Sequence, residues 1–155
     1  MENRDAIGSW LDGPKAAAEQ AGVDFGYRGE RLGLPEEGPG SIAPVGRRIA
    51  ALFIDWFLCL VIAYGLIAQG DARGANQWTT VVFAVLSVLT LGTIGMTPGK
   101  RLLRLRVVRL DGTRLGLGAV VLRTLLLLLV IPAAVWDRDT RGLHDKAVGA
   151  VQVRL

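Results

Sequence analysis

Asp55 and Arg123 are charged residues that lie inside long apolar stretches of the sequence. Asp55 follows Arg48 by seven residues, about two helical turns, so both side chains project from one face of a helix. A lone carboxylate in the middle of a membrane helix costs about 2.5–3.5 kcal/mol on an insertion scale. Arg123 lies seven residues into its own apolar run, at a depth that matches that of Asp55. We therefore predict an ion pair between Asp55 and Arg123, with Arg48 nearby.

This group of intramembrane charges has two interpretations. As a structural pair, it orients two helices against each other. As a functional site, Asp55 would carry a cation or a proton. The three apolar runs contain no acid other than Asp55, and this favours the structural interpretation.

Residue types for enzymatic chemistry are sparse in the rest of the chain. Nucleophilic catalysis needs a base close to a Ser or Cys, and the sequence has one histidine, His144, and one cysteine, Cys59. No cluster of His, Cys and carboxylate residues has the spacing of metal ligands. We expect a protein that is not an enzyme, with no catalytic residue, no metal site and no cofactor.

Three apolar runs must position these charges. They cover residues 49–68, 78–96 and 116–136, and each contains at most one charged residue. Twenty residues of helix span about 30 Å, the thickness of the hydrocarbon core of a bilayer. We predict an all-α membrane protein with transmembrane helices over 49–68 and 78–96 and a third membrane helical segment over 116–136.

The basic residues indicate how the chain is oriented. Residues 97–114 contain six Lys and Arg residues against Asp111, and Arg47–Arg48 precede the first run. Cytoplasmic loops are enriched in Lys and Arg. We therefore predict a multi-pass protein of the bacterial plasma membrane with a cytoplasmic N-terminus, whose basic loop faces anionic lipid headgroups. Because the basic residues flank apolar runs, we expect no nucleic-acid partner.

Two segments have the alternation of β-strands. In residues 101–108, RLLRLRVV, and in the C-terminal AVQVRL, apolar and polar residues alternate. A small cytoplasmic β element is plausible, with Asp111–Gly112 as a hairpin turn. If the third run spans the membrane, the C-terminal strand lies on the opposite side from the basic loop. If the strands pair, the run must be re-entrant or bend back at Pro132. We favour strand pairing.

Residues 1–45 form a polar N-terminal arm that precedes a membrane domain over 46–155. The arm is rich in Gly and Pro, so it has too little apolar surface to bury a core. Either it is a disordered tail, or its apolar residues dock onto a partner. The candidate docking residues are Trp10, Leu11, Phe25, Tyr27, Leu32 and Leu34.

Three motifs resemble those of the RDD family of small bacterial membrane proteins, which is named for one arginine and two aspartates. They are RIAALFID at 48–55, TPGKRLLRLRVV at 97–108 and RGLHDKAVGAVQVRL at 141–155. The resemblance covers residues 46–155 and assigns the family's three residues to Arg48, Asp55 and Asp145. The polar arm is similar to that of actinobacterial members.

The resemblance implies two possible functions. One is a non-catalytic accessory or assembly subunit of a larger membrane protein complex, for example a respiratory complex, whose partners are other integral membrane proteins. The alternative is a small oligomeric transporter, with cation–proton exchange through Asp55. Two or three helices do not enclose a pathway on their own, so transport would require several copies.

Overall fold

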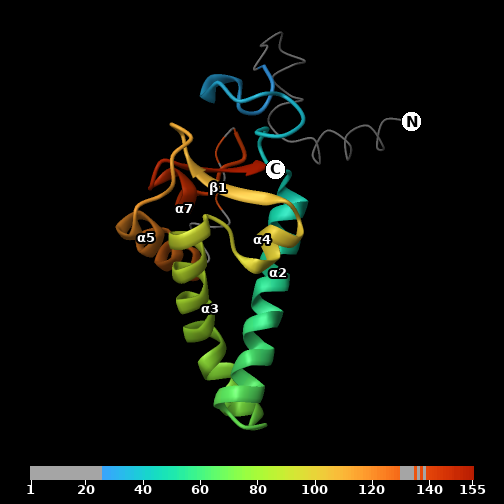
Figure 1. Cartoon of the computed structure of the whole chain (residues 1–155), viewed down its shortest axis with the longest axis vertical. Coiled ribbons are helices and arrows are strands. Elements are labelled where there is room, and N and C mark those ends of the chain that lie inside the picture. Colours follow the sequence, from blue (N-terminus) through green and yellow to red (C-terminus); the bar gives the residue numbers. More distant parts are fainter. Residues whose placement is uncertain (1–25, 130–134, 136, 138) are drawn as a thin grey trace, which may run out of the picture.

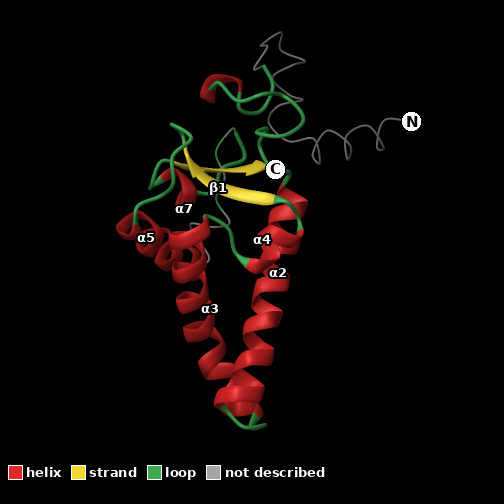
Figure 2. Ribbon diagram, viewed as in Figure 1, coloured by secondary structure: helices red, strands yellow, loops and turns green. Residues whose placement is uncertain are grey.

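The computed structural model describes residues 26–129, 135, 137 and 139–155. Two long helices form a helical hairpin, and a small sheet with short helices forms a head at its open end (Figure 1). In the hairpin, α2 spans Val45–Ile62 and continues as the π-helix η2, Ala63–Ile67, and α3 spans Ala72–Ile94. The head contains α4 Pro98–Leu102, β1 Leu105–Arg109, α5 Leu117–Leu128, α7 Leu143–Lys146 and β2 Ala150–Arg154. The helices of the hairpin meet at their connecting turn and diverge towards the head (Figure 2).

The hairpin confirms two long apolar helices where the sequence predicted transmembrane helices. Each of 45–67 and 72–94 is 23 residues long and apolar enough to cross a membrane, and 23 residues of helix reach about 35 Å. Most of their surface faces outward, and Phe53, Phe57 and Leu66 are 70%, 67% and 78% exposed. Large apolar side chains exposed along both helices suit a lipid environment.

Both helices begin earlier than the apolar runs predicted. Asp71 caps α3 by accepting hydrogen bonds from the backbone N–H groups of Arg73 and Gly74, at 3.3 and 2.8 Å. This cap satisfies donors that the first turn of a helix leaves unpaired. Helix α3 therefore starts six residues before the expected Trp78, in a polar stretch that hydropathy alone assigns to the loop.

Each helix of the hairpin buries a stripe of residues spaced four apart. On α2 the stripe is Ala51, Asp55 and Cys59, and it continues to Ala63 at the start of η2; on α3 it is Ala75, Thr79, Phe83, Ser87 and Leu91. Residues four apart form ridges that pack into the grooves of a neighbouring helix. The small size of most of these residues allows close packing between membrane helices.

The third apolar run contains a helix shorter than expected. The prediction was a membrane segment over 116–136, whereas α5 ends at Leu128 and has 12 residues. A helix of that length reaches about 18 Å, which is less than the roughly 30 Å of a hydrocarbon core. It packs against α3 and α7, so its buried face belongs to the head.

The strands pair in the way we favoured from the sequence. Strand β1 runs antiparallel to β2, with Leu105 opposite Arg154 and Arg109 opposite Ala150. The C-terminal strand therefore lies on the same side of the hairpin as the basic segment. The turn at Asp111–Gly112 forms, with the Gly112 N–H donating to Arg109 O at 2.9 Å, but residues 113–116 directly after it form no strand.

The end of the N-terminal arm belongs to the head. Ile42 forms a bridge to Val153, and the Ala43 N–H donates to Gln152 O at 2.8 Å. Leu32, the last residue of the 3-10 turn η1 (Glu30–Leu32), and Leu34 pack against the cluster of Ile42, Val151 and Val153. These two leucines therefore have contacts inside the chain. Trp10, Leu11 and Phe25 lie outside the described residues, and Tyr27 is half-buried, so docking onto a partner stays a prediction.

Strand pairing can be tested by cross-linking. In a Cys59→Ala background, Val108→Cys with Val151→Cys should form a disulfide on mild oxidation, because these residues are direct partners in the sheet and partners in an antiparallel pair lie about 4.5–5.5 Å apart. Val108→Cys with Val153→Cys is the control, since its second cysteine is two residues further along β2. Peptide mass spectrometry detects the link. Equal cross-linking of the two pairs would contradict the register.

Candidate functional site

Asp55 fastens α2 to the segment that follows α3. Its side chain is 2% exposed. Its Oδ1 accepts a hydrogen bond from the Gly99 N–H at 2.7 Å, and its Oδ2 accepts one from the Thr97 hydroxyl. Two hydrogen bonds replace the water that a buried carboxylate loses. Asp55 is thus satisfied within the chain, by a hydroxyl and a backbone amide.

The sequence Thr-Pro-Gly-Lys makes this contact possible. Thr97 is the N-cap of α4 and Pro98 occupies its first turn, where proline's missing N–H is tolerated. At Gly99 a Cβ atom would lie 2.3 Å from the Ala51 carbonyl oxygen. Only glycine therefore lets the backbone of α4 approach α2 closely enough to donate to Asp55.

Asp145 is the second buried carboxylate, and it joins three elements of the head. Arg123 Nε on α5 contacts its Oδ1 at 2.6 Å, and Gln152 Nε2 on β2 donates to its Oδ2 at 2.7 Å. His144 Nε2 lies 3.4 Å from Oδ2. Burial raises the pKa of the Asp145 carboxyl, but the charge of Arg123, the neighbouring His144 and the Gln152 hydrogen bond bring it down to about 2.

The predicted pair between Asp55 and Arg123 is therefore wrong. Arg123 pairs with Asp145, and Asp55 is bonded to Thr97 and Gly99. The prediction matched the positions of the two charges within their apolar runs and considered only side chains as partners. Backbone N–H groups are equally strong donors, and the turn at 97–99 supplies one.

Arg48 likewise has a partner other than the expected one. Its Nη1 donates to Thr140 O at 2.6 Å, which ties the start of α2 to the segment before α7. The three residues that name the resemblance thus make three separate contacts. Arg48, Asp55 and Asp145 each fasten a different part of the hairpin or the head.

Sequence reasoning missed Lys100 and Gln152 as buried residues. Lys100 was counted with the exposed basic loop, yet it is 5% exposed, and Gln152 was placed on the polar face of its strand, yet it is also 5% exposed. Burial and repulsion from Arg123 lower the pKa of Lys100 to about 8, against the opposing pull of Asp55 and Asp145. The signal for Lys100 was its place in the Thr-Pro-Gly-Lys motif.

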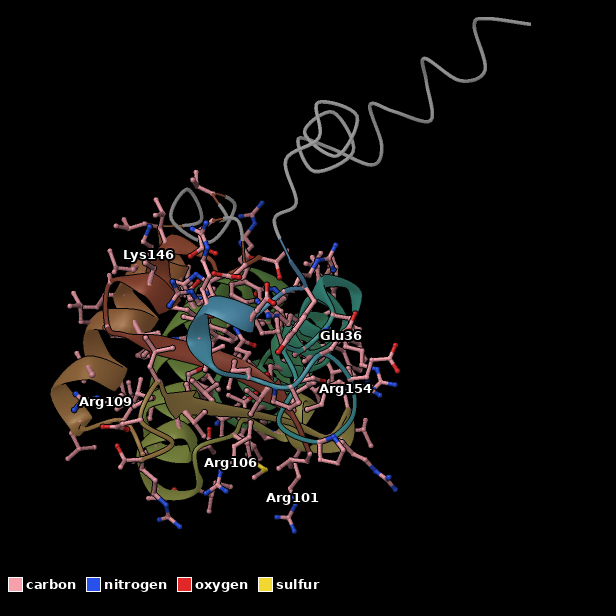
Figure 3. The ribbon with its side chains drawn as sticks, turned by 90° about the horizontal axis from the view of Figure 1, so that it is seen from above. Glu36, Arg101, Arg106, Arg109, Lys146 and Arg154 are labelled. Carbon is pink, nitrogen blue, oxygen red and sulfur yellow. The ribbon has the colours of Figure 1, made fainter. Side chains whose placement is uncertain are left out.

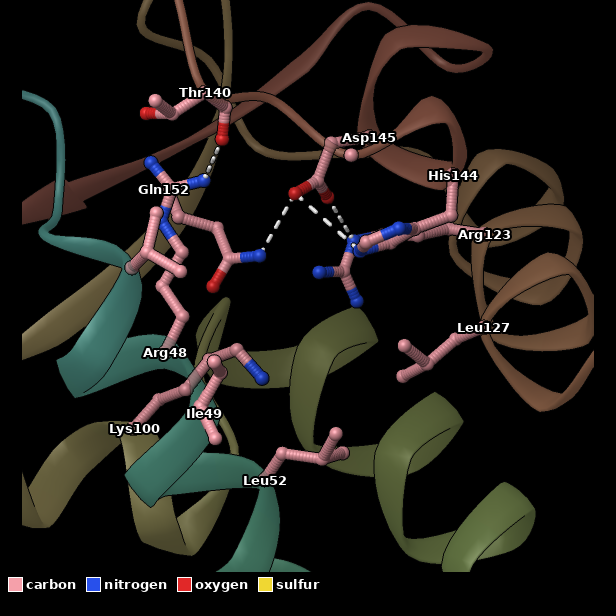
Figure 4. Close-up of a pocket in the computed structure, with 12 residues that line it drawn as sticks. Arg48, Ile49, Leu52, Lys100, Arg123, Leu127, Thr140, His144, Asp145 and Gln152 are labelled. Carbon is pink, nitrogen blue, oxygen red and sulfur yellow. Dashed lines mark hydrogen bonds and ion pairs between the residues drawn. The ribbon is translucent and has the colours of Figure 1, made fainter. Parts of the chain in front are cut away.

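These residues surround a cavity of about 80 Å³ at the junction of hairpin and head (Figure 4). Its polar wall is formed by Arg48, Lys100, Arg123, His144, Asp145 and Gln152. Side chains of Ile49, Leu52 and Leu127 form an apolar wall. Charged side chains from both the hairpin and the head therefore share this cavity with an apolar surface (Figure 4).

A hairpin of two membrane-length apolar helices, closed by a head with a buried Arg–Asp pair, defines a small integral membrane protein. The model of the RDD family matches residues 42–149, and the chain belongs to this family. That match includes Arg48, Asp55 and Asp145. Comparison with curated proteins and with solved structures found no match.

The Arg123–Asp145 pair should dominate the stability of the head. Asp145→Asn should destabilise the protein by about 3–5 kcal/mol, because Arg123 would keep a charge without a counter-ion at a site that is 1% exposed. Arg123→Leu should have a similar effect, and the double variant should lose less than the sum. Denaturant unfolding in detergent measures this coupling. A matched cycle of Asp55→Asn with Arg123→Leu should show much weaker coupling. Stronger coupling of Arg123 to Asp55 than to Asp145 would refute the Arg123–Asp145 pair.

The close approach at Gly99 gives a second test. Gly99→Ala should destabilise the protein by more than 1 kcal/mol, since its Cβ would meet the Ala51 carbonyl and displace the N–H that binds Asp55. Gly118→Ala in α5 is the matched control, because a Cβ there meets nothing within 4 Å. That change should be neutral or stabilise the helix by up to about 1 kcal/mol. Thermal unfolding of both variants in detergent would show the contrast.

Proposed function

We propose that this chain is a non-catalytic accessory or assembly subunit of a larger membrane protein complex in the bacterial plasma membrane. The observation that carries the proposal is that both carboxylate oxygens of Asp55 are already hydrogen-bonded within the chain. This carboxylate lies in the hairpin and already accepts hydrogen bonds from Thr97 and Gly99. A transported cation or proton would have to compete with these donors for the same two oxygens, so the geometry favours a structural role for Asp55.

An outward stripe on α2 supports association with another membrane protein. It lies opposite the stripe that packs on α3, and its members are exposed large side chains spaced four and three apart: Phe53, Phe57 and Leu60 on α2 and Tyr64 on its continuation η2. Membrane helices associate through close packing rather than through hydrophobic expulsion from water. Aromatic residues dominate the binding energy of many protein interfaces. We propose this α2 stripe as the contact with the partner.

The charge distribution supports a cytoplasmic head. Arg101 and Arg109 are exposed, and Figure 3 shows Arg101, Arg106 and Arg109 at the periphery of the head. Basic residues beside membrane helices are enriched on the cytoplasmic side and attract anionic headgroups, with about 1 kcal/mol for each side chain near the surface. Residues 26–44, which precede α2 and contact the head, would then also be cytoplasmic, and we propose the same side for the N-terminus.

Co-purification from native membranes tests the accessory role. The wild-type chain extracted in mild detergent should carry a different membrane protein in fixed stoichiometry, measured by mass spectrometry. Phe53→Ala with Phe57→Ala should reduce the recovered partner by about tenfold, while insertion and folding persist. Val85→Ala with Leu89→Ala is the matched control on the exposed face of α3. Recovery of homo-oligomers alone would contradict the proposal and favour the small oligomeric transporter that uses Asp55.

A further inference from the structure

The cavity at the junction of hairpin and head holds more positive than negative charge. Arg48, Lys100 and Arg123 line it, and Asp145 is the carboxylate among the lining residues. Asp55 accepts hydrogen bonds from the segment that carries Lys100. When Asp55 is included, three cationic side chains face two carboxylates. The pKa of Lys100, lowered to about 8 by burial and by Arg123, leaves its ammonium charged at neutral pH.

Several buried donors at this cavity have no hydrogen-bond partner within the part of the chain that the structure describes. They are Arg123 Nη1 and the Nε and Nη2 atoms of Arg48. Arg123 is 1% exposed, so its unpaired donor is costly. Figure 4 shows the Arg123 guanidinium and the Lys100 nitrogen directed towards the space between α2, α5 and β2. Charged donors that converge on one space recognise an anion.

The other polar atoms of the cavity and its volume limit the class of ligand that it can bind. Gln152 Oε1 and Thr140 Oγ1 are also buried without a partner among the described residues, and both can accept a hydrogen bond from a hydroxyl group. A cavity holds a water molecule from about 10–15 Å³, so about 80 Å³ admits a larger polar group. A phosphate that carries hydroxyl groups satisfies both the cationic donors and these acceptors.

We propose that this cavity binds a phosphate oxyanion, held by Lys100, Arg123 and Arg48. The apolar wall favours the phosphate of an anionic membrane lipid, since Ile49 is partly exposed and Leu52 and Leu127 continue the apolar surface from the cavity towards the hairpin. A glycerol headgroup would place its hydroxyls near Gln152 and Thr140. The site does not depend on the accessory role, because it is built from one chain.

Titration of the full chain in a nonionic detergent tests this site. The probes are dihexanoyl phosphatidylglycerol, inorganic phosphate and, as a probe without phosphate, dihexanoylglycerol. We expect saturable binding of one phosphatidylglycerol per chain by calorimetry, and no saturable binding of dihexanoylglycerol. Tighter binding of the lipid than of inorganic phosphate would assign the ligand to a headgroup, and equal binding would assign it to the free anion. Absence of saturable binding by both phosphate probes would overturn the proposal.

A matched pair of variants localises the binding. Lys100→Met removes the buried ammonium and keeps an apolar stem of similar size, and it should weaken binding about tenfold, the effect of losing one charged hydrogen bond. Arg101→Met removes an equal charge from the next, exposed residue and should leave the affinity within about twofold. If Lys100→Met does not fold, Arg48→Gln makes the same comparison. Equal affinities for the wild type and the folded cavity variant would also overturn the proposal.

Discussion

Removing an ion from water costs several kcal/mol even after a protein relaxes around it, and this chain meets that constraint at Asp55, Arg123 and Asp145. Asp145 and Arg123 neutralise each other at 2.6 Å, and Gln152 holds the second carboxylate oxygen. Asp55 accepts hydrogen bonds from a hydroxyl and a backbone amide. Each solution requires two or three elements to lie at fixed positions. The arrangement of α4, α5, α7 and β2 around the open end of the hairpin follows from where these charges must find partners.

The sequence was sufficient for features that depend on local pattern. Long apolar runs predicted α2 and α3, and alternation predicted which side chains of β1 are buried, as Leu105 and Val107 confirm. Helix ends were less accurate, because the Asp71 cap lies outside the apolar run that was used to find α3. Capping depends on a few hydrogen bonds, and hydropathy does not record them.

The site was only partly predictable, because pairing of buried charges is a tertiary property. Arg48, Asp55, Arg123 and Asp145 were all identified, yet the partner of Asp55 was wrong. The prediction considered only oppositely charged side chains as partners of Asp55, so it overlooked the backbone N–H of Gly99. That N–H reaches Asp55 only because the backbones of α4 and α2 approach closely at Gly99. Gln152 was missed because alternation assigns a polar strand residue to the exposed face. In the structure its amide donates a hydrogen bond to the buried carboxylate of Asp145. A polar residue in a strand can therefore be buried when it pairs with a buried charge from another part of the chain.

The pairing of β1 with β2 has a consequence for biogenesis. Leu105 and Arg154 are partners across the sheet, and all of α5 and α7 lie between them in the chain. A nascent chain therefore exposes α2 and α3 to the membrane while β1 still lacks its neighbour and Arg123 lacks its carboxylate. Insertion and closure of the head become separate events, since long-range contacts form late. Proteases that recognise unpaired strands and uncompensated charges would have a physical basis for removing chains that insert without closing the head.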